Sequence, residues 1–171
     1  MIHFVGAGPG AVDLITVRGQ KLLETADQII YAGSFVNPQL LACAKKDCRI
    51  LDSAGMTLEA VIAAMEEGEG QGWMTVRLHT GDPSVYGAIR EQMDILSQKG
   101  LAYDVVPGVS SLCAAAASLQ AEYTLPGISQ SVIITRMEGR TPVPDKQKIA
   151  DYAAHQATMV IFLSASLLDG L

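Results

Sequence analysis

The 171-residue sequence is poor in cysteine, in aromatic residues and in positive charge. Its three cysteines are an odd number, which argues against a disulfide framework and predicts reduced thiols. Cys43 and Cys48 bracket the segment A-K-K-D, and the three histidines are scattered along the chain, so no group of residues has the spacing of metal ligands. We therefore expect neither a structural disulfide nor a metal site.

The sequence also lacks a long apolar run and a basic region. Hydrophobic residues make up 49% of the chain, but no run reaches the ~18 residues of a membrane span. The formal net charge is −6, whereas a nucleic-acid interface needs clustered lysine and arginine. No basic segment followed by an apolar stretch stands near Met1, as a secretory signal would require. These absences predict a soluble, cytoplasmic protein that binds neither membrane nor nucleic acid.

Short apolar segments alternate with helical patterns over the first 119 residues. Strands are predicted at residues 2–5, 28–31, 49–51, 73–79 and 103–106. Helices are predicted at residues 17–24, 38–44, 57–67, 85–99 and 110–119. Strands that alternate with helices form a parallel sheet, because each connection has to cross back over the sheet. We predict an N-terminal α/β domain, residues 1–119, with a five-stranded parallel sheet flanked by helices.

A second α/β pattern follows a predicted linker at residues 120–130. Strands are expected at 131–135 and 158–163, with a Pro-rich loop and a helix starting behind Asp145 between them. Two strands and a helix or two are few for an independent domain. We therefore expect residues 131–171 to be the beginning of an incomplete second α/β domain, so that the chain is either a fragment or relies on a site completed elsewhere.

Residues 6–11, G-A-G-P-G-A, fit the spacing of the dinucleotide-binding fingerprint. The fingerprint requires a helix that starts within the glycines, but Pro9 removes a donor and the helical pattern begins only after Thr16. The second predicted strand also ends without the acidic residue that binds a ribose. Three interpretations stay open: the nicotinamide site of an NAD-dependent oxidoreductase, a tight turn without a ligand, and an open loop that lines the cleft of a bulky ligand.

The fourth predicted strand breaks at Gly81-Asp82-Pro83 and a helical pattern follows. Open α/β sheets bind ligands at the carboxyl ends of their strands, so this turn is the first place to look for function. Asp82 followed by Pro83 is a good N-cap and first helical residue. We expect the Asp82 carboxylate to hold the turn while the main chain faces a ligand.

Several segments, in this order along the chain, resemble the tetrapyrrole methylase family. The matching stretches are V-G-A-G-P-G-A-V-D-L-I-T-V-R-G at 5–19, H-T-G-D-P-S-V-Y-G at 79–87 and V-V-P-G-V-S-S at 105–111. The stretches Y-A-G-S-F-V at 31–36, E-Y-T-L-P-G at 122–127 and I-T-R-M-E-G-R-T-P-V-P at 134–144 are similar to family members of cobalamin biosynthesis. The resemblance covers essentially the whole chain. It implies transfer of a methyl group from S-adenosylmethionine to a ring carbon of a tetrapyrrole.

The resemblance also implies site residues and an assembly state. Cofactor contacts are expected from Pro9, Thr80, Gly81, Asp82, Val85, Ser110, Ser111 and Leu163. Substrate contacts are expected from Arg136, Arg140 and Tyr123. The two arginines are chosen because guanidinium groups pair with carboxylates, which a tetrapyrrole substrate carries. The alternative is that both arginines are solvated charges of the loop. No residue is marked as a catalytic base, and His79 and Tyr123 are only weak candidates. A homodimer is expected, and an inactive ligand-binding fragment stays open beside the enzyme.

Overall fold

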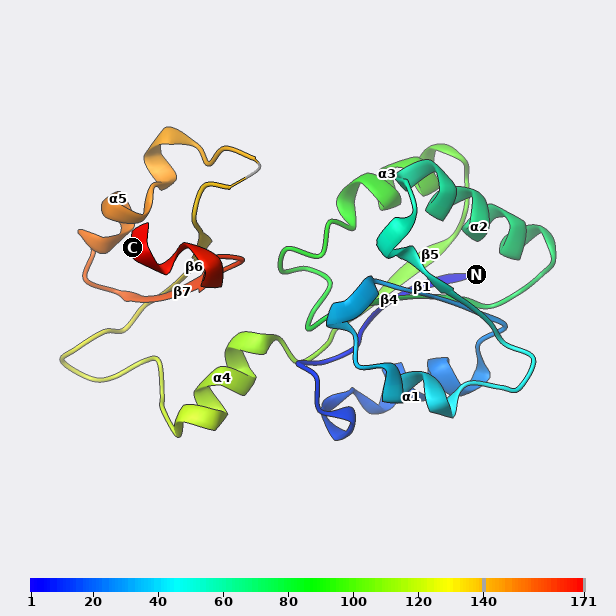
Figure 1. The fold of residues 1–171 in the computed structure, drawn as a ribbon, viewed down its shortest axis with the longest axis horizontal. Helices are drawn as coiled ribbons and strands as arrows, with labels where there is room; N and C mark the ends of the chain where they lie inside the picture. Colours follow the sequence, from blue (N-terminus) through cyan, green and yellow to red (C-terminus); the bar gives the residue numbers. More distant parts are fainter. Residues whose placement is uncertain (140, 171) are drawn as a thin grey trace. The chain divides into compact units, whose positions relative to one another are not determined.

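The computed structural model describes residues 1–139 and 141–170, and the chain forms two compact units, Met1–Ala114 and Ala115–Leu171 (Figure 1). The first unit contains a five-stranded parallel sheet with the strand order β3-β2-β4-β1-β5. Its strands are β1 (Ile2–Gly6), β2 (Gln28–Tyr31), β3 (Arg49–Asp52), β4 (Thr75–His79) and β5 (Tyr103–Val106). The predicted α/β fold with a five-stranded parallel sheet is confirmed.

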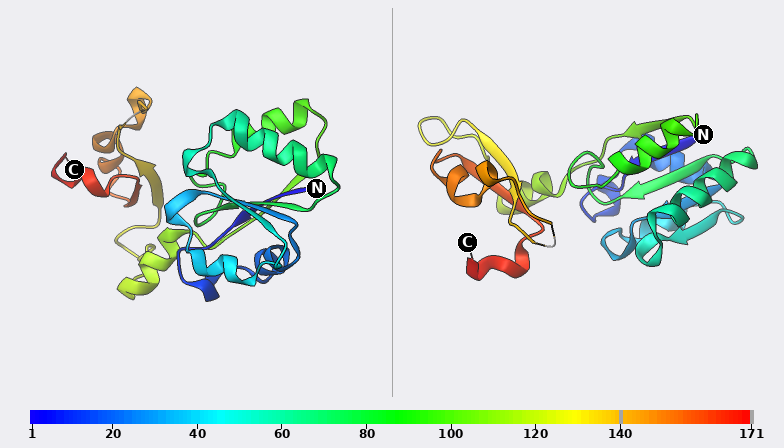
Figure 2. Two further views of the ribbon diagram at one scale, coloured as in Figure 1. Left: turned by 45° about the vertical axis from the view of Figure 1, so that its right-hand side comes forward. Right: turned by 90° about the horizontal axis from the view of Figure 1, so that it is seen from above.

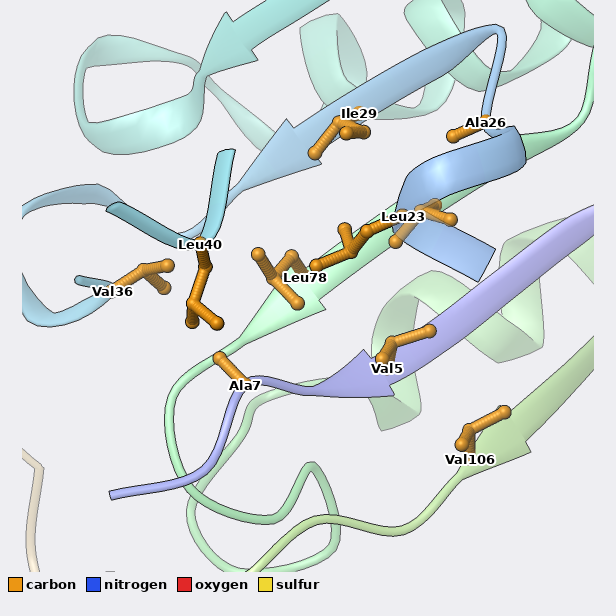
Figure 3. Packing of buried hydrophobic residues seen from close by; sticks show 10 residues of the cluster. Val5, Ala7, Leu23, Ala26, Ile29, Val36, Leu40, Leu78 and Val106 are labelled. Atoms are coloured by element: carbon orange, nitrogen blue, oxygen red, sulfur yellow. The ribbon is translucent and has the colours of Figure 1, made fainter. Parts of the chain in front are cut away.

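Helices cover both faces of this sheet (Figure 2). The elements are α1 (Val17–Thr25) and the 3-10 helix η3 (Pro38–Cys43) on one face, with α2 (Leu58–Gly70) and α3 (Arg90–Gln98) on the other. Because side chains alternate along a strand, Ile29 packs with Leu23 and Leu78 on the α1 face, as Figure 3 shows, while Ile30 packs with Met65 on the α2 face. Burial on both faces is typical of a parallel sheet, and it places apolar side chains at the consecutive positions Ile29 and Ile30 of β2.

Polar side chains fix where several helices begin. The Thr16 hydroxyl accepts a hydrogen bond from the Gly19 N–H at 3.1 Å, and the Thr57 hydroxyl accepts one from Ala60 at 3.2 Å. Each bond satisfies a main-chain donor that the first helical turn leaves without a partner. Helix α1 therefore begins after Thr16, as predicted, and well beyond the glycine loop.

Three predicted helices differ from the structure. Residues 38–43 form a 3-10 helix rather than an α-helix, with the Asn37 side chain accepting from the Gln39 N–H at 3.0 Å. The helix predicted at 57–67 continues to Gly70, since a glycine costs a packed helix only about 1 kcal/mol. The helix predicted at 85–99 begins at Arg90, because Tyr86 and Ala88 take positive φ values of 54° and 51° that no α-helix contains.

The second unit has its own small sheet. Strands β6 (Val132–Arg136) and β7 (Thr158–Phe162) pair in parallel, and the 3-10 helix η5 (Asp145–Gln147) and helix α5 (Ile149–Ala153) lie between them in the chain. The 3-10 helix η6 (Ala165–Gly170) follows β7. The division between the units falls within helix α4 (Ser111–Leu119), and the domain limits 1–119, 120–130 and 131–171 stay a prediction. Among the described residues, no helix combines the length and the apolar character that a bilayer span requires.

Candidate functional site

The carboxyl ends of β1 and β4 are tied together by main-chain hydrogen bonds of the loops that follow them. Past the parallel pairing of β1 and β4, the Ala7 N–H donates to the His79 carbonyl at 2.7 Å. Gly8 and Gly81 then exchange two hydrogen bonds, of 3.2 Å and 2.8 Å, as an antiparallel bridge. The glycine loop and the turn at 80–85 thus form one surface at the carboxyl edge of the first unit's sheet.

Glycines at three strand ends allow these loops to touch backbone to backbone. A Cβ atom on Gly108 would lie 2.1 Å from the Gly81 carbonyl oxygen, and one on Gly6 would lie 2.5 Å from the Gly108 Cα. Those distances are far inside van der Waals contact, and the clashing atoms are main chain, so they cannot move as a side-chain tip does. Gly81 itself has a φ of 59°, a conformation that favours glycine.

The Asp82 carboxylate joins the turn after β4 to the loop after β5. One oxygen accepts hydrogen bonds from the Ser84 N–H, at 2.8 Å, and from the Ser84 hydroxyl, while the other accepts from the Gly108 N–H at 2.8 Å. Burial alone would raise the pKa of Asp82, but the bonds from Ser84 and Gly108 outweigh it and hold the pKa below its usual value. The carboxylate therefore braces two loops. It does not cap α3, which begins eight residues later, so the predicted N-cap role is wrong.

Seven of the expected cofactor residues share this carboxyl edge. Thr80 is exposed and Gly81 is buried, and Val85 donates its N–H to the Asp82 carbonyl at 3.2 Å. Ser110 opens α4 by accepting from the Cys113 N–H at 3.0 Å. The full set in the first unit is Pro9, Thr80, Gly81, Asp82, Val85, Ser110 and Ser111. The edge therefore offers main-chain groups, small hydroxyls and apolar side chains, which suit a ligand with polar and apolar parts.

The glycine loop does not open a helix. Only the 3-10 helix η1 (Val12–Leu14) lies between Gly10 and α1. The loop is instead held by a residue that sequence reasoning missed, because the Asn37 side chain donates to the Gly10 carbonyl at 2.7 Å. Without a helix N-terminus directed at the loop, the geometry of a dinucleotide pyrophosphate site is absent from this part of the structure.

Two ionisable side chains of β4 lie buried below the site. Arg77 donates from Nη1 to the Ile30 carbonyl at 3.1 Å and from Nε to the Gln92 Oε1 at 3.2 Å, and burial lowers its pKa to about 10. Burial, reinforced by the Arg77 charge, lowers the pKa of His79 to about 3. The His79 ring stacks on Phe4 with centroids 6.1 Å apart and is 4% exposed. A neutral, buried imidazole of this kind is a packing residue, which argues against the weak prediction of a catalytic base.

Arg136 lies at the carboxyl end of β6 in the second unit, and its guanidinium group donates hydrogen bonds to the loop that follows this strand. Its Nη1 donates to the carbonyls of Met137 and Thr141, both at 3.1 Å. Its Nη2 donates to the Thr141 hydroxyl at 2.9 Å and to the Pro142 carbonyl at 3.0 Å. All four Nη hydrogens of Arg136 are therefore donated within its own loop. The other predicted arginine, Arg140, lies outside the described residues.

The other predicted residues of the second unit lie near its two strands. The Tyr123 carbonyl accepts a hydrogen bond from the Thr158 hydroxyl at 2.7 Å. Leu163 directly follows β7, has a φ of 55° and is 72% exposed, which is unusual for a large apolar residue. Sequence reasoning missed buried Ser164, whose hydroxyl accepts from the Met137 N–H at 3.0 Å and donates to the Phe162 carbonyl at 2.7 Å. Ser164 thus joins the ends of β6 and β7.

Comparison with known proteins gives a consistent result. The family described as Tetrapyrrole (Corrin/Porphyrin) Methylases matches residues 1–171. The cobalt-precorrin-4 C(11)-methyltransferase of Methanocaldococcus jannaschii is 58% identical over 168 residues, which are 98% of this chain and 65% of that protein. The chain therefore spans about two thirds of the length of this curated relative.

Solved structures of other proteins are also similar to the chain, among them two methyltransferases. The X-ray structure of the cobalamin biosynthetic enzyme cobalt precorrin-4 methyltransferase is 49% identical, with a TM-score of 0.95 over 98% of this chain and 70% of that one. The crystal structure of uroporphyrin-III C-methyl transferase from Thermus thermophilus, complexed with S-adenyl homocysteine, is 25% identical. Its TM-score is 0.76 over 97% of this chain and 67% of that one.

Proposed function

Because the chain belongs to the tetrapyrrole (corrin/porphyrin) methylases, we propose that its protein methylates C-11 of precorrin-4 or cobalt-precorrin-4 in cobalamin biosynthesis, with S-adenosylmethionine as methyl donor. The observation that carries the proposal is the 58% identity, over 98% of the chain, to a cobalt-precorrin-4 C(11)-methyltransferase. Cobalt-precorrin-4 is the first substrate to test, since that relative and a solved structure are both named for it. None of the relatives and structures described above is named as an oxidoreductase.

We place the cofactor at the carboxyl edge of the first unit, where the residues fit its chemistry. S-adenosylmethionine carries a charged amino acid group, a sulfonium and an adenosine. Pro9 and Val85 supply apolar walls, and Thr80, Ser110 and the Gly81 main chain supply polar groups. Ser111 is a further proposed contact at this edge. Leu163, exposed in the second unit, stays a cofactor contact that only the family resemblance implies. Because all described hydrogen bonds of the Asp82 carboxylate go to Ser84 and Gly108, we assign Asp82 to shaping the site.

The reaction makes a modest chemical demand on the protein. S-adenosylmethionine, when bound, supplies a methyl group on a sulfonium and is released as S-adenosylhomocysteine. An electron-rich ring carbon accepts the methyl group, so the protein needs no nucleophile of its own. The chain's contribution is then orientation, and aligned reactants gain up to ~7–11 kcal/mol in the best cases. Loops fixed by Gly6, Gly108 and Asp82 are suited to that task.

Substrate recognition is proposed for the loop after β6. The carboxylates of a precorrin need local positive charge on a chain whose net charge is −6. Arg136 offers its charge, but with its Nη groups donated to its own loop we expect attraction rather than bidentate pairing. Arg140 stays the proposed bidentate partner, and Tyr123 a proposed contact. We further propose that the protein is a cytoplasmic homodimer. Sedimentation velocity of the purified protein tests the oligomeric state.

Ligand-dependent thermal stability tests the cofactor proposal. A ligand that binds the folded state stabilises it by about 2.7 kcal/mol at a hundredfold excess over its dissociation constant. We expect S-adenosylhomocysteine to raise the Tm and NADH to leave it unchanged. A rise with NADH alone would favour the oxidoreductase, and binding without turnover of cobalt-precorrin-4 would favour the inactive ligand-binding fragment. Turnover of that substrate, followed by mass spectrometry, completes the test.

A further inference from the structure

The α2 face of the first unit's sheet contains an arginine without an acidic partner. Arg77 is 6% exposed, and within residues 1–139 and 141–170 it forms no ion pair with a carboxylate. Its hydrogen bonds go to the Ile30 carbonyl and to Gln92 Oε1. Taking an unpaired charge out of water is costly, so an apolar residue would stabilise this position better. The arginine therefore calls for a role beyond packing.

Gln92 links Arg77 to loop 86–88, which follows the turn at 80–85. The side chain is 5% exposed on α3 and uses both ends of its amide. Oε1 accepts from Arg77 Nε at 3.2 Å, and Nε2 donates to the Ala88 carbonyl at 3.1 Å. An uninterrupted chain of hydrogen bonds thus runs from the Ile30 carbonyl of β2 through Arg77 and Gln92 to Ala88.

The segment that this chain reaches, residues 86–88, has an unfavourable backbone conformation. Tyr86 and Ala88 have φ values of 54° and 51°, which side-chain-bearing residues rarely adopt. Between them, a Cβ on Gly87 would lie 2.2 Å from the Pro83 carbonyl oxygen, so the loop folds tightly onto the turn at 80–85. Such a conformation persists only where surrounding contacts enforce it, and it is frequent at ligand sites.

We propose that Arg77 and Gln92 are positioning residues: they hold loop 86–88, with Tyr86 and Ala88 in their left-handed conformation, and so fix the turn at 80–85 for the cofactor. The cofactor part rests on the proposed function, whereas the clamp on the loop does not. The buried arginine orients the Gln92 amide by donating to its oxygen, which leaves the amide nitrogen to donate to Ala88.

Gln92→Glu separates the clamp from general stability. The variant keeps an oxygen acceptor for Arg77 and even gives it a carboxylate partner, but a carboxylate cannot donate to the Ala88 carbonyl. Gln92→Leu removes both bonds at similar volume. Gln98→Glu makes the same chemical change at an exposed position of the same helix and is the matched control.

Two readouts test the proposal on the folded protein. Amide hydrogen exchange over residues 83–89 should be roughly tenfold faster in Q92E and Q92L and unchanged in Q98E. The dissociation constant of S-adenosylhomocysteine should rise roughly tenfold in both Gln92 variants, although the Tm of Q92E stays at or above that of Q92L.

If Gln92 only stabilised the fold, the affinity for S-adenosylhomocysteine and the exchange rate over residues 83–89 would change in proportion to the change in Tm of each variant. Wild-type exchange over 83–89 in Q92E would overturn the proposal, and so would wild-type affinity for S-adenosylhomocysteine in a Q92E protein that exchanges faster. If the wild-type protein itself fails to bind S-adenosylhomocysteine, the proposed cofactor is wrong, and the exchange measurement still decides whether the clamp exists.

Discussion

Replacing His79 by phenylalanine should make the protein less sensitive to acid. The ring is 4% exposed, and burial lowers its pKa from 6.5 to about 3, so the folded state takes up this proton only in strong acid. The unfolded chain takes it up near its ordinary pKa. Between pH 6.5 and pH 3 the unfolded state therefore binds more protons, and the free energy of unfolding falls as the pH falls. Phenylalanine keeps an aromatic ring against Phe4 but cannot titrate.

The expected size follows from the two pKa values. The contribution of His79 changes by about 1.4 kcal/mol per pH unit within this window, which amounts to about 2.5 kcal/mol between pH 7 and pH 4.5. Urea unfolding at both pH values, followed by the fluorescence of the single tryptophan, Trp73, measures the loss. The loss should be smaller by about 2.5 kcal/mol in H79F than in the wild type.

The matched control is His155→Phe, which removes an exposed histidine of the second unit and should keep the wild-type pH dependence. An H79F protein that loses as much stability as the wild type between pH 7 and pH 4.5 would refute the reasoning. In that case the buried ring would already be protonated in the folded state, or the site would open to water below neutral pH.

Three further substitutions test the braced carboxyl edge and the arginine loop. Gly108→Ala places a Cβ 2.1 Å from the Gly81 oxygen, so S-adenosylhomocysteine should no longer raise the Tm. Gly70→Ala, where a Cβ meets nothing within 4 Å, should leave the ligand response intact. Asp82→Asn turns one amide donor toward the N–H of Gly108 or Ser84 and should cost about 1–3 kcal/mol of stability in urea unfolding; an unchanged midpoint would contradict the brace. Arg136→Lys keeps the positive charge, but a lysine ammonium cannot replace the four hydrogen bonds that the two Nη groups donate to the loop after β6. The variant should therefore have a higher KM for the tetrapyrrole and nearly the wild-type affinity for S-adenosylhomocysteine. An equal loss of affinity for both ligands would count against a role of Arg136 in substrate binding.

Most of the first unit's sheet could be predicted from local patterns. Segments such as residues 2–5 and 28–31 are short, apolar and bounded by turn residues, which is sufficient to place β1 and β2. The start of α3 could not be predicted in this way. Tyr86 and Ala88 have left-handed φ values, Gly87 approaches the Pro83 carbonyl closely, and Gln92 donates to the Ala88 carbonyl. Hydrophobic periodicity carries no signal for any of these features.

The candidate site shows the same division. The turn Gly81-Asp82-Pro83 stands out in the sequence, because its residue types interrupt a buried strand. Nothing in the sequence connects it to Gly108, whose N–H binds the Asp82 carboxylate, or connects Asn37 to Gly10. Arg77 and Gln92 are fifteen residues apart, and neither position identifies the other as its partner.

The sequence by itself determined the α/β class, the strands and the location of the candidate site at strand ends, because these depend on hydrophobic periodicity and turn chemistry within short segments. Only the tertiary structure decided which loops meet there. In the order β3-β2-β4-β1-β5, strand β1 lies between β4 and β5, which brings Gly6, Gly81 and Gly108 into contact. Strand order depends on packing between segments far apart in the chain, so local patterns do not predict it. For this reason the sequence predicts Asp82 as a helix cap, whereas in the structure its carboxylate joins two loops.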